Sequence, residues 1–408
     1  MGMNQTPSGE RLHIGFFGKR NAGKSSLVNA VTGQELAIVS QIKGTTTDPV
    51  YKSMELLPLG PVVMIDTPGL DDEGELGLLR IGKARQVVNK TDIGVIVIDG
   101  REGIGRQEEE LIQIFQKKEI PFLIVYNKMD LCQSEDNGAK ALQPPQFQLS
   151  AEESGCSVLW VSATEKKGIR ELKEAIGRLR PEEKGRRLLA DLVNPGDTVV
   201  LVVPVDKAAP KGRLILPQQQ AIRDILDQEG IAMVCQDSRL KQTLEQMKEK
   251  PKLVITDSQV FPQVDRLTPS DIKMTSFSVL FARYKGNLWQ AVEGARALEH
   301  VRDGDKILIS EGCTHHRQCG DIGTCKLPAM IRRYTGKEPE FSYTSGVEFP
   351  EDLSEYCLVI HCGGCMLTER EMRYRLGMAA DQKIPMTNYG IIIAYMNGIL
   401  ERSLKPLI

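Results

Sequence analysis

Five cysteine and histidine side chains have the types and spacing of a metal site. Cys313 and His315 form a Cys-x-His pair, and His361, Cys362 and Cys365 form a His-Cys-x-x-Cys group further along the chain. Three thiolates and two imidazoles can converge on one centre. The residues alone leave two metals open: a zinc ion held by three Cys and one His, or a 4Fe-4S cluster held by three Cys with a weaker or exchangeable ligand on the fourth iron.

Two expected strands would position both halves of this metal motif. Apolar runs at 306–310 and 357–361 lead into the motif residues, and they alternate with segments of helical pattern, which is typical of a parallel sheet. Open parallel sheets bind their ligands beyond the carboxyl ends of the strands. Thr368 and Glu371 fit a capping box that would begin a helix just after Cys365, and the N-terminus of that helix would favour thiolates.

A second constellation, near the N-terminus, has the pattern of a phosphate-binding loop. The strand-like residues 12–17 lead into Gly, four residues and Gly-Lys-Ser, the strand-to-helix context that this motif needs. Backbone N–H groups of such a loop close around phosphates, Lys24 can reach the terminal ones, and the Ser25 hydroxyl suits Mg²⁺. The nucleotide contacts expected here are Gly18, Asn21, Ala22, Gly23, Lys24, Ser25 and Ser26.

The apolar run 62–65 leads into a third motif, which would complete the phosphate side of the site. Asp66, at the end of this run, can hold Mg²⁺ through water, and Gly69 can offer its N–H to a γ-phosphate. Lys24, Asp66 and Gly69 are therefore residues expected to support phosphate-bond cleavage.

Two further motifs select the base. The run 122–126 leads into Asn127, Lys128 and Asp130, whose carboxylate would accept hydrogen bonds from the N1–H and amine of guanine, which adenine cannot match. The run 158–161 ends at Ser162 and Ala163, the expected backbone contact to the guanine carbonyl. Four motifs in this order, each ending a strand, predict a GTP site.

These motifs resemble those of the translation-factor-like small GTPases, and within them the Era and MnmE group. Residues 44–48 look like the switch I of that group, in which a threonine closes on Mg²⁺. Spacing alone does not decide among Thr45, Thr46 and Thr47; we favour Thr46 as the Mg²⁺ and catalytic residue, with Thr45 and Thr46 contacting the nucleotide. Leu70 stands where Ras-type enzymes carry the water-orienting Gln, which implies slow intrinsic hydrolysis. Asn21 matches the asparagine that binds K⁺ in MnmE-like relatives; alternatively it is a loop-turn residue.

Composition limits the class of protein. The chain has 408 residues, of which 41% are hydrophobic, and this length is too great for a single hydrophobic core. Its net charge of -2 argues against a general nucleic-acid binder. No apolar stretch is long enough to span a membrane, so we expect a soluble cytoplasmic protein. Six of the nine cysteines lie between Cys313 and Cys365, and in a reducing compartment this clustering favours metal over disulfides.

The pattern of strands and helices predicts an α/β fold of three domains: a phosphate-loop GTPase at 1–180, a small α/β dimerisation domain at 187–262, and a parallel-sheet cluster domain at 270–408. Charged and Pro-containing runs at 180–187 and 258–271 would connect them. In the middle domain we expect three strands, at 198–203, 232–234 and 253–256, with an exposed edge that favours a homodimer. In the last domain we expect a strand at 276–282, and helices at 287–301, 329–334, 368–381 and 388–400.

The whole arrangement resembles the FeFe-hydrogenase maturation GTPases of the HydF family. This resemblance implies that Cys313, Cys362 and Cys365 bind a 4Fe-4S cluster, with His315 and His361 near it or as occasional ligands of the fourth iron. It also implies a scaffold that carries a diiron precursor to the apo-hydrogenase, with the radical-SAM maturases HydE and HydG as partners. Whether Cys319 and Cys325 contribute to the cluster stays open.

A different class of function competes with this one. A regulatory GTPase with a structural zinc domain, acting in ribosome or tRNA biology like Era and MnmE, would fit the same motifs. The absence of a basic face interleaved with aromatic residues in the C-terminal part weighs against RNA binding.

Overall fold

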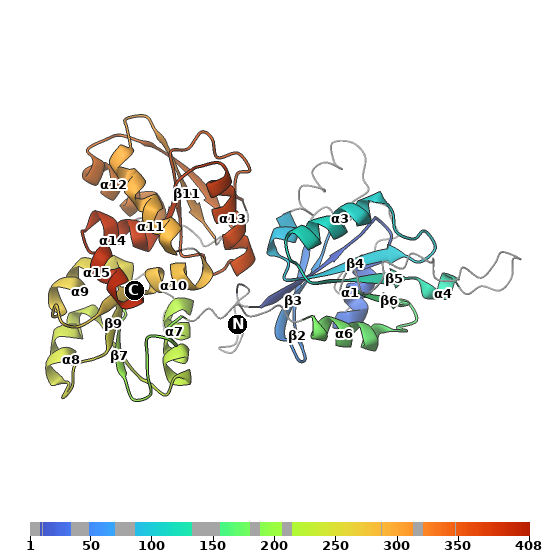
Figure 1. The fold of residues 1–408 in the computed structure, drawn as a ribbon, viewed down its shortest axis with the longest axis horizontal. Coiled ribbons are helices and arrows are strands. Elements are labelled where there is room, and N and C mark those ends of the chain that lie inside the picture. Colours follow the sequence, from blue (N-terminus) through green and yellow to red (C-terminus); the bar gives the residue numbers. More distant parts are fainter. Residues whose placement is uncertain are drawn as a thin grey trace, which may run out of the picture. The chain divides into compact units, whose positions relative to one another are not determined.

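A computed structural model of the protein describes residues 9, 11–33, 49–69, 86–132, 156–179, 188–205, 214–286, 288–312, 321–346 and 348–408. The chain divides into two compact units, Met1–Glu183 and Lys184–Ile408. Both are α/β, as predicted (Figure 1). No helix in the described part of the chain is long and apolar enough to cross a membrane.

The first unit is built on a six-stranded sheet in the order β2-β3-β1-β4-β5-β6. All neighbouring strands are parallel except β2, which is antiparallel to β3. The strands are β1 (Leu12–Phe17), β2 (Val50–Leu56), β3 (Gly60–Asp66), β4 (Ile93–Asp99), β5 (Phe122–Asn127) and β6 (Ser157–Trp160). The helices are α1 (Lys24–Thr32), α3 (Arg106–Lys117), α4 (Met129–Cys132) and α6 (Ile169–Arg178).

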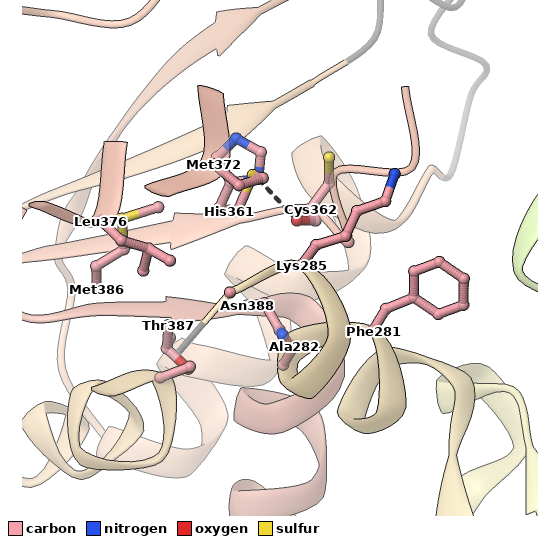
Figure 2. A pocket seen from close by; sticks show the side chains of 13 residues that line it. Phe281, Ala282, Lys285, His361, Cys362, Met372, Leu376, Met386, Thr387 and Asn388 are labelled. Carbon is pink, nitrogen blue, oxygen red and sulfur yellow. Dashed lines mark hydrogen bonds between the residues drawn. The ribbon is translucent and has the colours of Figure 1, made fainter. Parts of the chain in front are cut away.

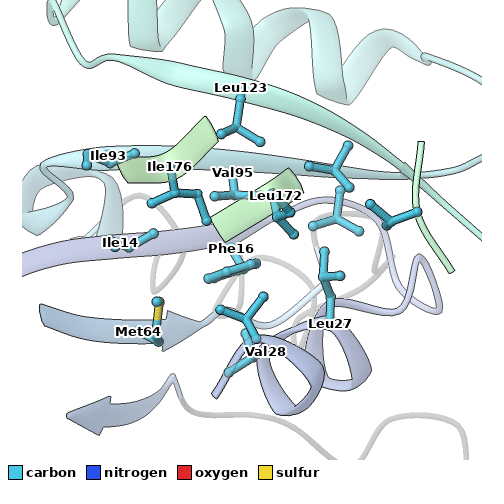
Figure 3. Packing of buried hydrophobic residues seen from close by; sticks show 14 of the residues in the cluster. Ile14, Phe16, Leu27, Val28, Met64, Ile93, Val95, Leu123, Leu172 and Ile176 are labelled. Atoms are coloured by element: carbon cyan, nitrogen blue, oxygen red, sulfur yellow. The ribbon is translucent and has the colours of Figure 1, made fainter. Parts of the chain in front are cut away.

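Both faces of this sheet are covered, which explains why its central strands are continuous apolar runs rather than alternating ones. Ile14 and Phe16 of β1 point to the face that α1 and α6 cover (Figure 3). Phe17, the next residue, packs on the other face with Phe115 of α3. Strands β1, β3, β4 and β5 are parallel, so their carboxyl ends lie at the same edge of the sheet. The polar residues that follow β1, β3 and β5 are therefore close together at this edge.

The second unit contains two four-stranded parallel sheets, in the orders β10-β9-β7-β8 and β12-β11-β13-β14. The first sheet has β7 (Thr198–Val202), β8 (Ile231–Cys235), β9 (Leu253–Thr256) and β10 (Met274–Ser276), with helices α7 (Leu216–Asp227), α8 (Leu240–Gln246), α9 (Phe261–Leu267) and α10 (Phe277–Lys285). The second has β11 (Lys306–Glu311), β12 (Glu340–Ser345), β13 (Leu358–His361) and β14 (Met386–Asn388), with α11 (Leu288–Arg296), α12 (Leu327–Thr335), α13 (Glu369–Asp381), α14 (Tyr389–Met396) and α15 (Leu400–Leu404).

Several expected elements of this unit differ in the structure. The run 276–282, expected as a strand, is helix α10, because the Ser276 hydroxyl accepts a hydrogen bond from Val279 N at 3.2 Å and caps it. The expected connector 258–271 contains α9, and β10 joins the first sheet, so this sheet extends beyond residue 262, where we expected the domain to end. Strands β12 and β14 were not predicted, and the expected helix at 388–400 ends at Met396, before Gly398, whose φ is 69°.

The two sheets of the second unit repeat one design. Counted along the chain, the strands of each sheet lie side by side in the order fourth, third, first, second. The registers agree as well: Val202 pairs with Thr256 in the first sheet as Ser310 pairs with His361 in the second. A Leu-Val-Ile run precedes both Thr256 and His361. The described residues of 198–286 and 306–398 therefore repeat one strand order and register, and we call them the first and second repeats; helix α8, between β8 and β9, has no counterpart among the described residues between β12 and β13.

Equivalent helices of the two repeats pack against each other. The second residues of α10 and α14 are Ser278 and Gly390, and a Cβ added to Gly390 would lie 2.1 Å from Ser278 Cβ, so a larger residue there would separate the helices. The helices that follow them are exchanged: α11 packs on β14 of the second repeat, and α15 packs on β10 of the first. One hydrophobic cluster consequently contains buried residues of both repeats together with those of α11 and α15.

Candidate functional site

The phosphate loop lies between β1 and α1, as predicted. The Lys24 ammonium group donates hydrogen bonds to the carbonyl oxygens of Gly18 at 2.9 Å and Lys19 at 2.7 Å, so it lies across the loop. Gly23 has a φ of 91°, and a Cβ there would lie 2.2 Å from Asn127 Nδ2. This close approach requires glycine, and it brings the base-recognition motif against the phosphate loop.

The two predicted Mg²⁺ side chains meet at the edge of the sheet. Ser25 Oγ donates to Asp66 Oδ2 at 2.5 Å, and the other carboxylate oxygen of Asp66 is buried with no hydrogen-bond partner among the described residues. Burial raises the pKa of Asp66, and the Ser25 hydrogen bond and the nearby Lys24 charge oppose the rise. A hydroxyl and a carboxylate with one oxygen to spare are a donor set that fits Mg²⁺.

Asn127 and Asp130 are held by hydrogen bonds from other motifs. Asn127 Nδ2 donates to the carbonyl oxygen of Ala22 at 3.0 Å, and Asn127 Oδ1 accepts from Ala163 N at 3.1 Å. Asp130 Oδ1 accepts from Ser162 Oγ at 2.6 Å. The structure thus brings together the described residues of the phosphate loop and both base motifs.

Sequence reasoning missed a carboxylate that positions Lys128. Asp99, at the end of β4, accepts hydrogen bonds from Lys128 Nζ at 2.7 Å and from Arg101 Nη2 at 2.7 Å. Burial raises the pKa of Asp99, but these hydrogen bonds lower it further and hold it well below its usual range. The only sequence signal was an acidic residue at the end of an apolar strand, as at Asp66.

Some predicted site residues lie outside the described part of the chain, namely Thr45, Thr46, Leu70, Cys313, His315 and Cys319. Asn21 is described: it is exposed and has a φ of 61°. Ser26 is the third residue of α1, and Gly69 lies so close to Arg20 that a Cβ would approach its backbone nitrogen to 2.9 Å.

The His-Cys-x-x-Cys group lies where predicted, at the carboxyl end of β13. Cys362 Sγ accepts hydrogen bonds from Gly312 N at 3.0 Å and Gly364 N at 3.4 Å. Gly364 has a φ of 63°, which permits the tight turn. Two backbone N–H donors on one sulfur are the surroundings that stabilise a thiolate ligand of an iron-sulfur cluster.

Cys365 follows in the same turn, before the α13 cap. Burial raises the pKa of the Cys365 thiol, and the charge of Lys285 opposes the rise. The Thr368 hydroxyl accepts from Glu371 N at 3.2 Å and caps α13, as expected. Within the described residues no three potential ligands gather at one point, and Cys313, the third expected thiol, lies outside them.

A small cavity of about 30 Å³ adjoins this turn. Figure 2 shows Lys285, His361 and Cys362 around it, with the apolar side chains of Met372 and Leu376. Thr387 also lines it, and its buried hydroxyl has no hydrogen-bond partner among the described residues. Thr275, the equivalent of Thr387 in the first repeat, has the same property, so this feature belongs to the repeated fold rather than to a ligand site.

Both ring nitrogens of His361 are engaged within the protein. Nδ1 lies 2.7 Å from the carbonyl oxygen of Cys362, and Nε2 lies 3.0 Å from Nη1 of Arg375. Complete burial and then the Arg375 charge lower the pKa of His361 to about 3, so the imidazole is neutral. His361 therefore lies beside the cysteine turn with its lone pair directed to a guanidinium.

The fold and the site of the first unit define a P-loop GTPase. Residues 13–128 match the model of the 50S ribosome-binding GTPase family. Residues 188–286 match the hydrogen maturase F dimerization domain, and residues 289–406 match the hydrogen maturase F tetramerization domain. The chain belongs to the hydrogen maturase F (HydF) family.

Individual relatives each match only part of this chain. The tRNA modification GTPase MnmE of Desulfotalea psychrophila is 34% identical over 160 residues, which are 39% of this chain and 32% of MnmE. GTPase Der of Desulforamulus reducens is 29% identical over 189 residues, which are 45% of this chain and 43% of Der. The crystal structure of Aquifex aeolicus Era bound to GDP and AlF4⁻ has a TM-score of 0.37 at 22% identity, covering 62% of this chain and 97% of Era. The chain spans less than half the length of these MnmE and Der proteins.

Proposed function

We propose that this protein binds and hydrolyses GTP and, at a 4Fe-4S cluster, carries the diiron precursor of the FeFe-hydrogenase active site to the apo-hydrogenase. The observation that carries the proposal is the turn after β13, within a hydrogen maturase F domain, where Cys362 Sγ accepts two backbone N–H groups. The partners would be the apo-hydrogenase and the maturases HydE and HydG, in the cytoplasm.

In the proposed GTPase function, each group of residues at the nucleotide site has a role. Lys24 binds the terminal phosphates, Ser25, Asp66 and Thr46 surround Mg²⁺, and the Gly69 N–H faces the γ-phosphate. Asp130 selects guanine, with Ser162 holding its carboxylate. Mg²⁺ supplies charge neutralisation of the phosphates when bound. Hydrolysis is slow because Leu70 cannot orient water, and K⁺ at Asn21 accelerates it.

The cluster part uses the second repeat. Cys313, Cys362 and Cys365 would hold the 4Fe-4S cluster through their thiolates, and the cluster would supply an exchangeable position at which the precursor binds. GTP binding changes contacts of the switch segments with a partner or a second protomer, since a switch acts only through contacts that differ between its states.

Association of protomers uses the first repeat. Strand β8 is an edge of its sheet, and its side chains Ile231 and Val234 are 52% and 45% exposed. An exposed apolar edge strand is a surface for pairing with another chain, and the match to a dimerization domain covers it. This supports a homodimer that pairs through this repeat.

The test is anaerobic reconstitution followed by iron, sulfide and zinc analysis and EPR of the reduced protein. We expect about four irons per chain and an S = 1/2 signal in the wild type, and loss of both in Cys362→Ser and in the Cys313/Cys362/Cys365→Ser triple variant. Cys357→Ala, a matched control outside the motif, should keep both. GTP affinity should be unchanged in all of them, because the nucleotide site lies in the other compact unit. One tightly bound zinc and no reconstitutable iron would contradict the cluster function.

A further inference from the structure

A fully buried arginine lies behind the cysteine turn. Arg375, on α13, has 0% exposure, and its guanidinium donates to Glu371 Oε1 at 2.9 Å, to the Gly346 carbonyl oxygen at 2.9 Å and to the imidazole of His361. The ring of Phe349 covers its face at 4.9 Å. Burying a charge is costly unless it is paired and hydrogen-bonded, so this constellation is built around Arg375.

Arg375 fixes the tautomer of His361. A guanidinium has donors and no acceptor, so His361 Nε2 must accept the hydrogen bond and carry no proton. A carbonyl oxygen only accepts, so the His361 proton must lie on Nδ1, which donates to the Cys362 oxygen. These hydrogen bonds link Arg375 through the His361 imidazole to the backbone of Cys362. The sulfur of Cys362 in turn accepts hydrogen bonds from Gly312 N and Gly364 N.

The first repeat has an equivalent hydrogen bond at the end of β9, where no cysteine follows the strand. Thr256 is equivalent to His361 by register, and its hydroxyl donates to the carbonyl oxygen of Asp257, the next residue, at 3.3 Å. Donation from the last strand residue to the following carbonyl is therefore a feature of the repeated fold. The second repeat performs it with an imidazole, which leaves a second nitrogen for Arg375 to hold.

We propose that Arg375 is a positioning residue of the cysteine turn, acting through His361, and that it keeps His361 out of the coordination sphere of iron. Arg375 occupies the one lone pair with which His361 could bind a metal. It also orients the Cys362 carbonyl, and with it the turn that presents the Cys362 and Cys365 sulfurs.

This role rests on the proposed cluster function, so its first measurement needs no cluster. The chain has five histidines, and ¹⁵N NMR of histidine-labelled apo-protein, with His361→Gln for assignment, reports the tautomer of each. We expect the neutral Nδ1–H form for His361 in the wild type, and in Arg375→Met we expect the ¹⁵N resonance of Nε2 to shift, because this nitrogen loses the guanidinium that donates to it. Arg373→Met, which removes an exposed arginine on the same helix, should leave the His361 signal unchanged.

The second measurement is made on the reconstituted protein. Residues that orient metal ligands typically change metal affinity by 10–100-fold, so Arg375→Met should release iron to a chelator roughly tenfold faster, while GTP hydrolysis stays constant. His361→Asn retains a donor for the Cys362 oxygen and should recover most of the stability that His361→Leu loses. Arg375→Met and His361→Leu combined should cost no more than either alone, because both break one chain of contacts.

A folding defect is separated from the proposed role by a second variant. Arg375→Met leaves Glu371 without its buried partner, so Glu371→Gln with Arg375→Met removes both charges; it should fold and still release iron rapidly. Three results would overturn the role: an Nε2–H tautomer in the wild type, iron release equal to wild type in this double variant, or a strongly coupled nitrogen in pulsed EPR that disappears in His361→Gln. Absence of reconstitutable iron in the wild type would instead refute the cluster function, and the tautomer would still test the contact of Arg375 with His361.

Discussion

Asn127 Nδ2 lies 3.0 Å from the carbonyl oxygen of Ala22, a hydrogen bond that joins residues 105 positions apart in the sequence. The same amide group accepts from Ala163 N through its oxygen. One side chain thus connects the loop that binds phosphates with the segment expected to bind guanine, so the two halves of a nucleotide are bound by one rigid frame.

Asn127→Asp should therefore weaken the binding of GTP and of GDP to the same extent. The carboxylate has nearly the same shape, but it cannot donate to Ala22, and an unmet hydrogen bond at a buried site costs about 1–3 kcal/mol. We expect a loss of roughly tenfold or more in affinity for both nucleotides, measured by calorimetry. Asn89→Asp, at a site where the side-chain oxygen accepts from Lys118, is the control. Equal affinities in wild type and Asn127→Asp would refute this role.

The exposed side chain of Asn21 tests the K⁺ proposal. Its φ of 61° is tolerated by glycine, so Asn21→Gly removes the side-chain oxygen without straining the loop. Replacing Na⁺ with K⁺ should raise the rate of GTP hydrolysis in the wild type and have no effect on the variant. The same K⁺ stimulation in both proteins would return Asn21 to a turn role.

His13 should make the GTPase unit sensitive to acid. Burial lowers the pKa of His13 from 6.5 to about 4, and Asp92, 4.0 Å from its Nδ1, does not offset this effect. Between these two pH values the unfolded chain binds a proton that the folded chain excludes, so stability falls as pH falls through this window, by about 3 kcal/mol in total. His13→Asn should lose this component, which calorimetry at pH values above and below the window would detect as a smaller shift in melting temperature. An identical shift in both proteins would contradict the buried neutral state.

Arg402 should stabilise a repeat to which it does not belong. On α15, it donates to Asp265 Oδ1 at 2.7 Å and to the carbonyl oxygens of Thr268 and Pro269 at 2.8 Å each, all in the first repeat. Arg402→Lys cannot make these bonds together, so amide hydrogen exchange in α9 and β10 should accelerate, consistent with a loss of about 1–3 kcal/mol. Arg223→Lys, in an exposed pair with Asp227, is the control. Unchanged protection in α9 would show that α15 adds little to the first repeat.

The sequence predicted the features that contiguous residues encode. The phosphate loop, Asp66 and the cysteine turn each follow an apolar run, so a local pattern was enough to place them at the ends of strands. The run after Ser276 has no such signal, because a short apolar segment reads as strand or helix, and the cap decided it. The partnership of His361 with Arg375 depends on how α13 packs on β13, which no spacing reveals. The repeat had a signal, the Leu-Val-Ile runs that end at Ile255 and Ile360, but it is short.

The exchanged helices α11 and α15 have a thermodynamic consequence. Helix α11, which follows the first repeat, covers β14 of the second, and α15, which follows the second repeat, covers β10 of the first. Unfolding of one repeat therefore exposes apolar surface of the other. We infer that the two repeats fold together, although the matched domains divide between residues 286 and 289. A ligand that binds only the folded second repeat must also stabilise the first, by mass action. If the proposed cluster binds at the cysteine turn, its loss would therefore also destabilise the first repeat and the β8 edge through which we propose that protomers associate.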